Sequence, residues 1–378
     1  MICVVWGRKC LAGNFIGKEF VVITFGESHG KCVGAVVDGC PAGLPFAEAD
    51  VQAMLDKRIP KNAAVVSARV EEDKVEIISG IFNGFTTGAP IAMLVENKDT
   101  RLDDYAALRR LPRPGHADYP AAVKYGGFND YRGGGRFSGR VTVPLVMTGA
   151  LAKKLLSYFG VEVLAYTRAI GKVRLPATPN LEDVRRLTYA TSVRCPSLQV
   201  ARAMEKAIVE AKAESDSLGG IVECVVTGVQ AGVGEPFFDA LDAEIAKLLF
   251  AIPGVKGVEF GAGFKAAELK GSENNDAFTI EAGKIVTLSN NAGGILGGLT
   301  TGMPIIVRVA FKPTSSIARK QQTVDLETMK PSSLKVTGRH DPCIVPKAVP
   351  VVESAAAIVL VDHMIRAGLM PKVLRGQK

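Results

Sequence analysis

Short runs of apolar residues recur along the chain and predict β-strands. They are rich in Val and Ile and are bounded by Gly or Pro, as strands usually are. The clearest runs are KEFVVITF (18–25), VGAVVDG (33–39), KVEIISG (74–80), APIAMLV (89–95), GIVECVVTG (220–228) and MPIIVRVAF (303–311). We therefore expect strands along most of the chain.

Helical periodicity lies between these runs. A first helix is expected over 47–57, and a second over 197–213, with Ser197 as its N-cap. Two more are expected over 239–252, which stops before Pro253-Gly254, and over 351–368, which ends at Gly368. The apolar faces of the first and third contain Val51, Met54 and Leu55, and Leu241, Ile245, Leu248 and Leu249. Because strands and helices do not alternate strictly, the pattern favours an α+β fold over a doubly wound sheet.

One stretch of the pattern occurs twice. FTTGAPIAMLV (85–95) reappears as LTTGMPIIVRV (299–309). From Ser79 to Thr86 is seven positions, and from Ser289 to Thr300 is eleven, so the second copy is expected to carry four extra residues in a glycine-rich loop. Chance similarity around a T-T-G-x-P-I turn is the alternative. We favour two related halves packed as one domain, with the longer loop adapted to a ligand.

Composition narrows the classes of protein. The chain has 378 residues, 47% of them hydrophobic, and a net charge of +8, which suits anionic partners or simply solubility. Seven cysteines without a C-x-x-C motif indicate neither a disulfide framework nor a zinc cluster, and they fit a reducing cytoplasm. The first residues are too short and broken for a signal peptide. No apolar run is expected to approach the roughly 18 residues that span a bilayer.

Three of the four histidines lie in tight segments that contain glycine. His29 is in GESHG, His116 is in RPGHADYP, and His340 precedes Asp341 in TGRHDPC. A single histidine of this kind is most often structural, but three in loops favour function, because loops place side chains at clefts. We interpret His29 and His116 as functional and His340 as the holder of the loop that presents Asp341. His363, in the last predicted helix, is interpreted as structural.

Arginine and glycine concentrate in the same part of the chain. Glycines let backbone N–H groups approach an anion, and arginines provide bidentate donors. The basic and hydroxyl residues are Arg109, Arg110 and Arg113, then Arg132, Arg136, Ser138 and Arg140, then Lys312, Thr314, Ser315 and Ser316, and finally Arg339. A solvated basic face would not need so much glycine, so the pattern predicts sites for phosphate and carboxylate groups. Neither a Walker A string nor a G-x-G-x-x-G unit is present, so a nicotinamide dinucleotide fold is not indicated.

Two other functions compete for these motifs. GESHG matches the G-x-S-x-G elbow of serine hydrolases, but that elbow joins a strand to a helix, and the segment after Gly30 has the pattern of another strand. His29 is also the immediate neighbour of Ser28, from which we expect that its ring cannot easily serve as the base. A nucleic-acid-binding module would interleave aromatic and basic residues, whereas aromatic content is 6%. We therefore reject the first function and rank the second low.

Six motifs together resemble the chorismate synthase family. GESHG, RPGHAD, GGGRFSGRVT, AGGILGG, KPTSS and GRHDPC occur in the family's order and with roughly its spacing, from about Gly13 to the last helix. The resemblance implies a β-α-β sandwich with internal pseudo-symmetry and a homotetramer. It implies a lyase that converts 5-enolpyruvylshikimate 3-phosphate to chorismate with reduced FMN. A small-molecule substrate is thus expected, with no nucleic acid and no membrane.

The resemblance also implies roles for single residues. His29 would hold a proton at the flavin, His116 would be the general acid at the leaving phosphate, and Asp341 would assist removal of the ring proton. Ser28 and Ser138 would hydrogen-bond in the same network. Substrate anions would be bound by Arg58, Arg113 and Arg140. FMN contacts would fall on Arg136, Phe137, Ser138, Pro253, Gly254, Gly297, Lys312, Pro313, Thr314, Ser315, Ser316 and Arg339.

The chain departs from the family pattern in a few places. A second arginine usually follows the one matched by Arg58; here Ala64 stands at its position, and Lys61 and Arg69 are the candidates to replace it. Gly139 stands where an alanine is common. Residues 1–12 precede the family's usual start and receive no role, and 13–378 are expected to form one catalytic domain. Some family members reduce their own FMN with NADPH, but no added reductase domain is evident, so we expect an external reductant.

Overall fold

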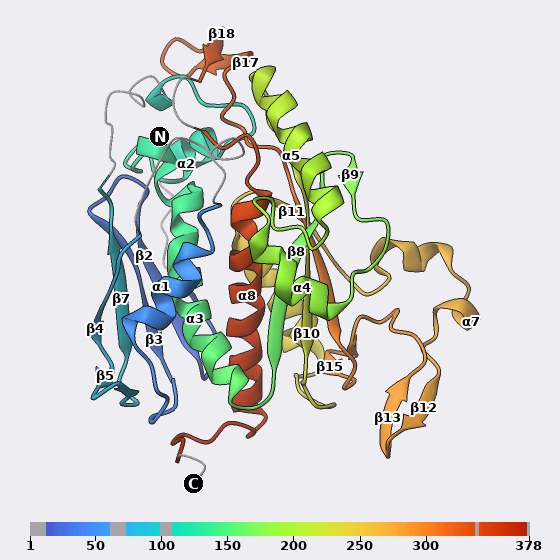
Figure 1. Cartoon of the computed structure of the whole chain (residues 1–378). Helices are drawn as coiled ribbons and strands as arrows, with labels where there is room; N and C mark the ends of the chain where they lie inside the picture. The colour runs from blue at the N-terminus through green and yellow to red at the C-terminus, as the bar shows by residue number, and fades with distance from the viewer. Residues whose placement is uncertain (1–12, 61–72, 99–107, 337–339, 376–378) are drawn as a thin grey trace.

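Two five-stranded antiparallel sheets enclose a layer of helices (Figure 1). The structure is a computed structural model, and it describes residues 13–60, 73–98, 108–336 and 340–375. The first sheet has the order β1 (Phe15–Ile16), β2 (Val21–Gly26), β3 (Cys32–Asp38), β7 (Ile91–Glu96) and β4 (Val75–Ser79). The second has the order β11 (Val255–Phe260), β16 (Ile305–Phe311), β10 (Gly220–Thr227), β8 (Glu162–Ile170) and β9 (Val173–Arg174). The α+β prediction is confirmed.

The helices between the sheets share one hydrophobic core with both of them. The layer consists of α1 (Glu48–Asp56), α3 (Val143–Ser157), α8 (Val345–Arg366) and α6 (Leu241–Ala251). In this layer α1 packs on α3, α3 on α8, and α8 on α6. The apolar faces predicted for the first and third helices are buried, and Ser197 caps α5 (Leu198–Ala213) by accepting a hydrogen bond from the Val200 amide.

The internal repeat predicted from the sequence is present in the architecture. The order β2-β3-α1-β4-β7-α3 in the first half corresponds to β8-β10-α6-β11-β16-α8 in the second. In the first half β7 lies between β3 and β4. In the second half β16 lies between β10 and β11 in the same way. The two halves therefore present matching helices to the shared middle layer.

Matching threonines hold matching hairpins in the two halves. Thr86 Oγ1 donates to the Pro41 carbonyl at 2.7 Å and accepts from the Leu44 amide, as Thr300 Oγ1 does with Gln230 (2.6 Å) and Val233. These threonines end β6 (Phe85–Thr86) and β15 (Leu299–Thr300), which pair with β5 (Ile81–Phe82) and β14 (Ile295–Leu296). The similarity between the two copies thus includes side-chain hydrogen bonds as well as sequence.

The prediction of a longer loop in the second copy is wrong. The Thr87 amide donates to the Gly80 carbonyl, and the Thr301 amide donates to that of Gly294, so both hairpins close over seven positions. The extra residues lie before Gly294. In the second half they follow an added hairpin of β12 (Phe278–Glu281) and β13 (Lys284–Thr287), which projects from the body in Figure 1.

Helix α3 is absent from the sequence-based prediction. Nearly all of its side chains from Val143 to Ala152 are buried, and so are Leu155 and Leu156. A helix that is apolar on every side shows no amphipathic period, which is the pattern that identifies a helix in a sequence. The helix is therefore evident only from its place between the two sheets.

Helix α8 is longer than predicted, because it begins at Val345 and not near Val351. By length and composition it could cross a membrane, with a mean hydropathy of 1.7 over 18 residues, so the expectation that no apolar run approaches this length is wrong. However, 94% of that window is buried inside the molecule. Its position between the sheets in Figure 1 identifies it as a core helix.

The remaining elements surround the sandwich. Helices α4 (Leu181–Leu187) and α5 pack on β8, and α7 (Gly271–Asn274) precedes the β12–β13 hairpin. At the opposite end of the molecule in Figure 1 lie α2 (Asp118–Lys124) and the hairpin of β17 (Lys320–Asp325) and β18 (Lys330–Lys335). The loops that carry most of the predicted site residues also lie at this end.

The crossing of α3 and α8 depends on Gly149. A Cβ added there would overlap the Cβ and Oγ of Ser354 in α8. Alanine gains about 1 kcal/mol of helix propensity, but overpacking a core typically costs about 1–3 kcal/mol. The two helix backbones must move apart at Gly149 and Ser354 to admit the methyl group. We therefore expect Gly149→Ala to lower the free energy of unfolding by about 1–2 kcal/mol. Denaturant unfolding measures this.

Gly271→Ala is the matched control for that substitution. An added Cβ at Gly271 meets no atom within 4 Å. The control is expected to leave stability nearly unchanged. Equal stability of the two variants would show that the α3–α8 crossing tolerates the added methyl group.

Candidate functional site

Loops from both halves of the chain meet at one end of the sandwich. Most of the predicted site residues lie on them. The loops are the turn 27–31 between β2 and β3, the segment 113–118 leading into α2, the glycine-rich segment 132–142, and residues 312–316 after β16. The contacts between these loops define the candidate site.

Three consecutive glycines form the backbone against which both predicted histidines lie. Gly133, Gly134 and Gly135 all have positive φ, at 58°, 84° and 51°. A Cβ on Gly133 would overlap the His29 ring, and one on Gly134 would lie 2.9 Å from Cε1 of His116. Only glycine adopts this conformation readily and leaves room for both rings. The two histidines, 87 positions apart in the sequence, thus share one strip of backbone.

Ser28 and His29 are buried next to each other. The Ser28 amide donates to the Gly135 carbonyl at 3.2 Å, which fixes the turn on the glycine strip. Nδ1 of His29 lies 3.2 Å from Ser28 Oγ, so the ring reaches its neighbour, and this distance counts against the expectation that it cannot easily serve as the base of Ser28. The other argument against a hydrolase is confirmed, since β3 follows the turn and no helix does.

His116 is oriented by a carboxylate that the sequence analysis did not single out. Nδ1 of His116 lies 2.7 Å from Asp118 Oδ1, and Arg113 donates to both oxygens of the same carboxylate at 2.7 and 2.8 Å. Burial alone would raise the pKa of Asp118, but hydrogen bonds from Arg113 and His116 outweigh it and hold the pKa well below its usual range. The ionised carboxylate favours a proton on Nδ1, and the other ring nitrogen, Nε2, lies 3.3 Å from Nη2 of Arg113.

The KPTSS loop is fixed to the His116 loop. Lys312 Nζ and Ser315 Oγ both donate to the Gly115 carbonyl, and Arg113 donates to Ser316 Oγ at 3.0 Å. The Lys312 amide in turn donates to the Gly254 carbonyl at 2.9 Å, which brings Pro253-Gly254 to the same place. Burial, and then the charge of Lys256, lower the pKa of Lys312. The ammonium group is thus partly withdrawn from water and lies among hydroxyl groups, which suits a site for an anion.

A buried carboxylate joins two of the predicted substrate arginines. Asp73 accepts from Arg58 at 2.8 Å through one oxygen and from Arg140 through the other. Arg58 also donates to Thr142 Oγ1 at 3.2 Å. Burial lowers the pKa of the Arg58 guanidinium, while the charges of Asp73 and Asp341 act in the opposite direction. Asp341, which accepts two 2.8 Å hydrogen bonds from Lys347, is thus close enough for its charge to act on the pKa of Arg58.

Arg140 connects this pair to the His29 turn. Its Nε donates to Asn97 Oδ1 at 2.8 Å, and the Asn97 amide group donates to the carbonyls of Glu27 and Gly30. Arg140 also donates to the Glu96 carbonyl at 3.4 Å. Several of its donors are thus used within the protein, so the geometry indicates a role in holding the site together.

The segment 136–138 lies beside the glycine strip. Arg136 points back to β2, where it donates to the Thr24 carbonyl at 2.8 Å and the Gly26 carbonyl at 3.3 Å, and burial lowers its pKa. Ser138 Oγ accepts from the Arg140 amide at 3.2 Å, and Phe137 is half-buried. The C-terminal flank of the strip is therefore anchored to β2 by Arg136.

Some predicted site residues are not brought to this cluster. Gly297 lies at the turn between β14 and β15, before β16 begins, whereas Lys312 follows the end of β16, about 23 Å away along a seven-residue strand. His363 is buried in α8, toward the end opposite Asp341, and burial lowers its pKa. Arg339, Lys61, Ala64, Arg69 and residues 1–12 lie outside the described residues.

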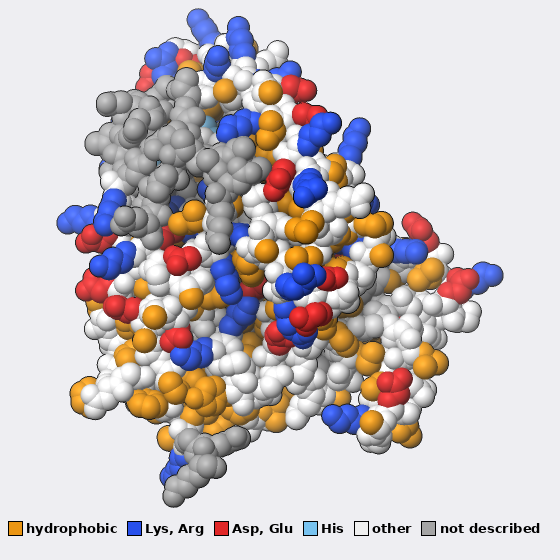
Figure 2. All heavy atoms as spheres, viewed as in Figure 1, with side chains coloured by type: hydrophobic (Ala, Val, Ile, Leu, Met, Phe, Trp, Pro, Cys, Tyr) orange, Lys and Arg blue, Asp and Glu red, His pale blue; other side chains and the backbone are white. Residues whose placement is uncertain are grey.

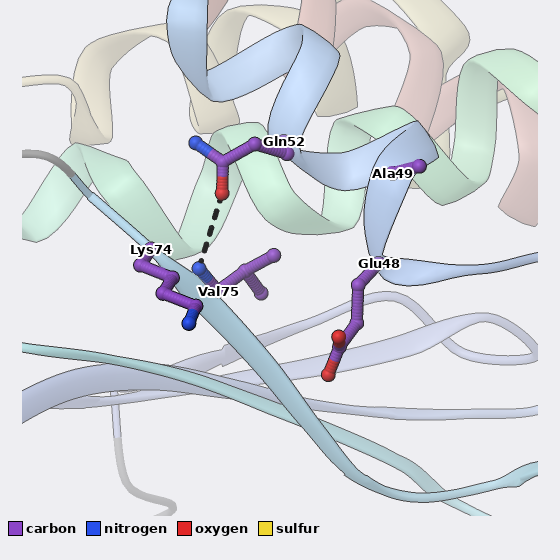
Figure 3. Close-up of a pocket in the computed structure, with 5 residues that line it drawn as sticks. All are labelled: Glu48, Ala49, Gln52, Lys74 and Val75. Carbon is purple, nitrogen blue, oxygen red and sulfur yellow. Dashed lines mark hydrogen bonds between the residues drawn. The ribbon is translucent and has the colours of Figure 1, made fainter.

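A pocket of about 370 Å³ lies away from the histidines, between α1 and β4 (Figure 3). Gln52 accepts a hydrogen bond from the Val75 amide at 3.3 Å, as drawn there, and Glu48 accepts one from Ile77 at 3.0 Å. Because β4 is an edge strand, these side chains satisfy amide groups that would otherwise be unpaired. Among the residues that the structure describes, none of the predicted site residues lines this pocket, and we assign it a structural role.

Comparison with known proteins gives a consistent result. A family described as chorismate synthase matches residues 20–365. Chorismate synthases of Korarchaeum cryptofilum and Methanocella arvoryzae are 54% and 55% identical to this chain; the alignments cover 94% and 97% of it and 99% and 98% of those proteins. A crystal structure of chorismate synthase is similar with a TM-score of 0.73 at 29% identity, covering 93% of each chain.

Proposed function

The chain belongs to the chorismate synthase family, and on this basis we propose that it converts 5-enolpyruvylshikimate 3-phosphate to chorismate. The proposed reaction is a 1,4-anti elimination of phosphate and a proton that requires reduced FMN. The observation that supports it best is the shared strip of Gly133 and Gly134, against which the His29 and His116 rings both lie, with buried arginines in the same site. An elimination that moves protons next to a departing phosphate needs such a combination.

The substrate carries one phosphate and two carboxylates, so it needs several fixed cations. Arg113 is buried and the Arg58 side chain is largely buried, and each is held by a carboxylate, Asp118 and Asp73 respectively. A planar guanidinium held along one edge can present its remaining N–H groups to an oxyanion. We propose that Arg113 binds near the leaving phosphate, because it adjoins His116, and that Arg58 binds a more distant anionic group.

His116 is the proposed general acid of the reaction. Its Nδ1 is held by Asp118 at 2.7 Å, so Nε2 can deliver a proton to the phosphate as the C–O bond breaks. Asp341, whose loop leads into α8, is proposed to assist removal of the ring proton. A positioned acid or base typically contributes about 10²–10⁴ in rate.

The KPTSS loop has the chemistry to hold FMN. Lys312 and the hydroxyls of Ser315 and Ser316 lie together, and Thr314 Oγ1 is buried without a hydrogen-bond partner among the described residues. An unsatisfied buried hydroxyl is unfavourable unless a ligand completes it. Bound reduced FMN would supply electron density that assists departure of the phosphate. His29 is proposed to hold a proton at the flavin, with Ser28 as its hydrogen-bond partner.

Charge on the surrounding surface favours capture of an anionic substrate. Figure 2 shows Lys and Arg side chains projecting from the upper end of the molecule, where β17 and β18 carry the exposed Lys320, Lys330 and Lys335. With a net charge of +8, the chain would attract a multiply charged anion, and this attraction would weaken with salt.

The broader context is proposed from the family. We propose a homotetramer that acts in the cytoplasm, with 13–378 as one catalytic domain and an external source of reduced FMN. Adding NADPH to oxidised FMN tests the last point, since only an enzyme that reduces its own flavin would then turn over.

Anaerobic turnover tests the proposed reaction itself. The protein with chemically reduced FMN should form chorismate and release phosphate in equal amounts, and oxidised FMN should not support the reaction. Turnover that is equally fast without flavin would overturn the proposal. Covalent labelling of Ser28 by a serine-directed phosphonate would instead support a hydrolase.

Lys312→Ala is expected to weaken FMN binding about tenfold or more. Loss of one charge-assisted hydrogen bond typically costs about 1.5–3 kcal/mol. Lys256→Ala is the matched control, because Lys256 is an exposed lysine close enough to influence the charge of Lys312. A flavin titration measures both variants. An unchanged titration for Lys312→Ala would remove this lysine from the flavin site.

A further inference from the structure

The backbone on both sides of Arg58 is held by an arginine from the other half of the chain. Arg58 lies just beyond α1, in the turn that ends this helix. Nη2 of Arg194 donates to the Lys57 carbonyl at 2.8 Å and to the Ile59 carbonyl at 3.2 Å. One guanidinium nitrogen therefore joins the two carbonyl groups that flank Arg58.

Arg194 is itself firmly fixed. It is buried, its Nη1 donates to the Tyr189 carbonyl at 3.1 Å, and its guanidinium carbon lies 5.1 Å from the centre of the Tyr189 ring. Its own carbonyl accepts from the Thr167 amide in β8 at 2.9 Å. Its φ of +59° is in the left-handed region, which a non-glycine residue occupies only where the surroundings require it.

The side chain of Arg58 depends on the placement of this turn. Its guanidinium meets fixed partners, Asp73 in the segment before β4 and Thr142 ahead of α3. If the turn shifts, the guanidinium either loses these hydrogen bonds or changes its orientation toward the proposed substrate anion. A misplacement of about 1 Å at a site can cost about 10² in activity.

We infer that Arg194 is a positioning residue that acts through Arg58, and this inference rests on the proposed role of Arg58 in binding a substrate anion. Arginine suits the task because its planar fork donates to several carbonyls at once, whereas a lysine is a single point of charge. The contact also ties the second sheet, through β8, to a binding group carried by the first half. A helix cap without function is the alternative.

A double-mutant cycle distinguishes a positioning role of Arg194 from a helix cap without function. Arg194→Met keeps the length of the side chain and removes every donor, and it is combined with Arg58→Ala. We expect Arg194→Met to raise KM for 5-enolpyruvylshikimate 3-phosphate about 10- to 100-fold, with little change in kcat and none in the dissociation constant of FMN. In the Arg58→Ala background, Arg194→Met should raise KM no further, because both act through one group.

The outcomes are distinct. An unchanged KM in folded Arg194→Met, or equal effects with and without Arg58, would overturn the inference and leave a helix cap. If Arg58→Ala itself leaves KM unchanged, the proposed substrate role of Arg58 fails instead. If Arg194→Met does not fold, the same comparison is made with Arg194→Lys. Arg186→Gln, an exposed arginine on α4 paired with Asp183, is the control and should behave as the parent protein.

Discussion

His116→Ala is expected to lower turnover by about 10²–10⁴, the contribution of a positioned general acid. The fold should persist, because the side chain is replaced by a smaller one at the edge of a loop. Asp118 would keep its hydrogen bonds from the side chain and the amide of Arg113, so no buried carboxylate is left without a partner. Phosphate release under anaerobic conditions with reduced FMN measures the effect, and Tyr119→Phe on the exposed face of α2 is the control.

His29→Ala should slow turnover by a similar factor, about 10²–10⁴, but with a different spectrum. The protonation state of bound reduced FMN should change, because its proposed proton partner is gone, whereas His116→Ala should leave that spectrum near the parent's. The opposite pattern would mean that the two roles are exchanged. If neither substitution slows turnover, both histidines are structural and the acid lies elsewhere.

Gly133→Ala is expected to lower kcat/KM by about 10² or more, because it displaces the His29 ring. A non-glycine residue in the left-handed region costs about 1–2 kcal/mol, and the added Cβ would overlap the imidazole as well. These are separate effects, and a second glycine distinguishes them. Gly127 also has positive φ, at 81°, but an added Cβ there meets no atom within 4 Å.

Gly127→Ala therefore carries the backbone strain without the crowding. It should lose stability to a similar extent but keep most of its activity. Unfolding transitions and steady-state kinetics of the two variants give the comparison. Equal activities would show that the glycine strip does not hold His29 in its working position.

The sequence predicts those parts of the fold that depend on local pattern. All six apolar runs contain a strand, and the faces of α1 and α6 are buried as expected. Helix α3 could not be predicted, because a helix buried on all sides has no polar face to mark its period. The prediction of a longer loop is wrong for another reason. It treats Ser79 and Ser289 as equivalent, and these serines are not equivalent in the two hairpins.

In the site, the motifs could be predicted, but the contacts between them could not. His29, His116 and the KPTSS loop are conspicuous by residue type, and the structure brings them together. Asp118 stands two positions after His116, and this spacing was available in the sequence. In contrast, Asp73 and Arg194 act across long stretches of chain, and only the packed structure shows which arginine each of them meets.

The central position of α8 has a consequence for synthesis. This helix follows every other described helix and strand along the chain, yet it packs against β8 and β10, and its Glu353 accepts a hydrogen bond from the Ala165 amide at 3.0 Å. While a ribosome is still producing residues 345–366, the parts of β8 and β10 that α8 covers lack this helix. The nascent chain therefore carries uncovered apolar surface on these strands until late in translation, and such surface makes a chain prone to aggregation without chaperones.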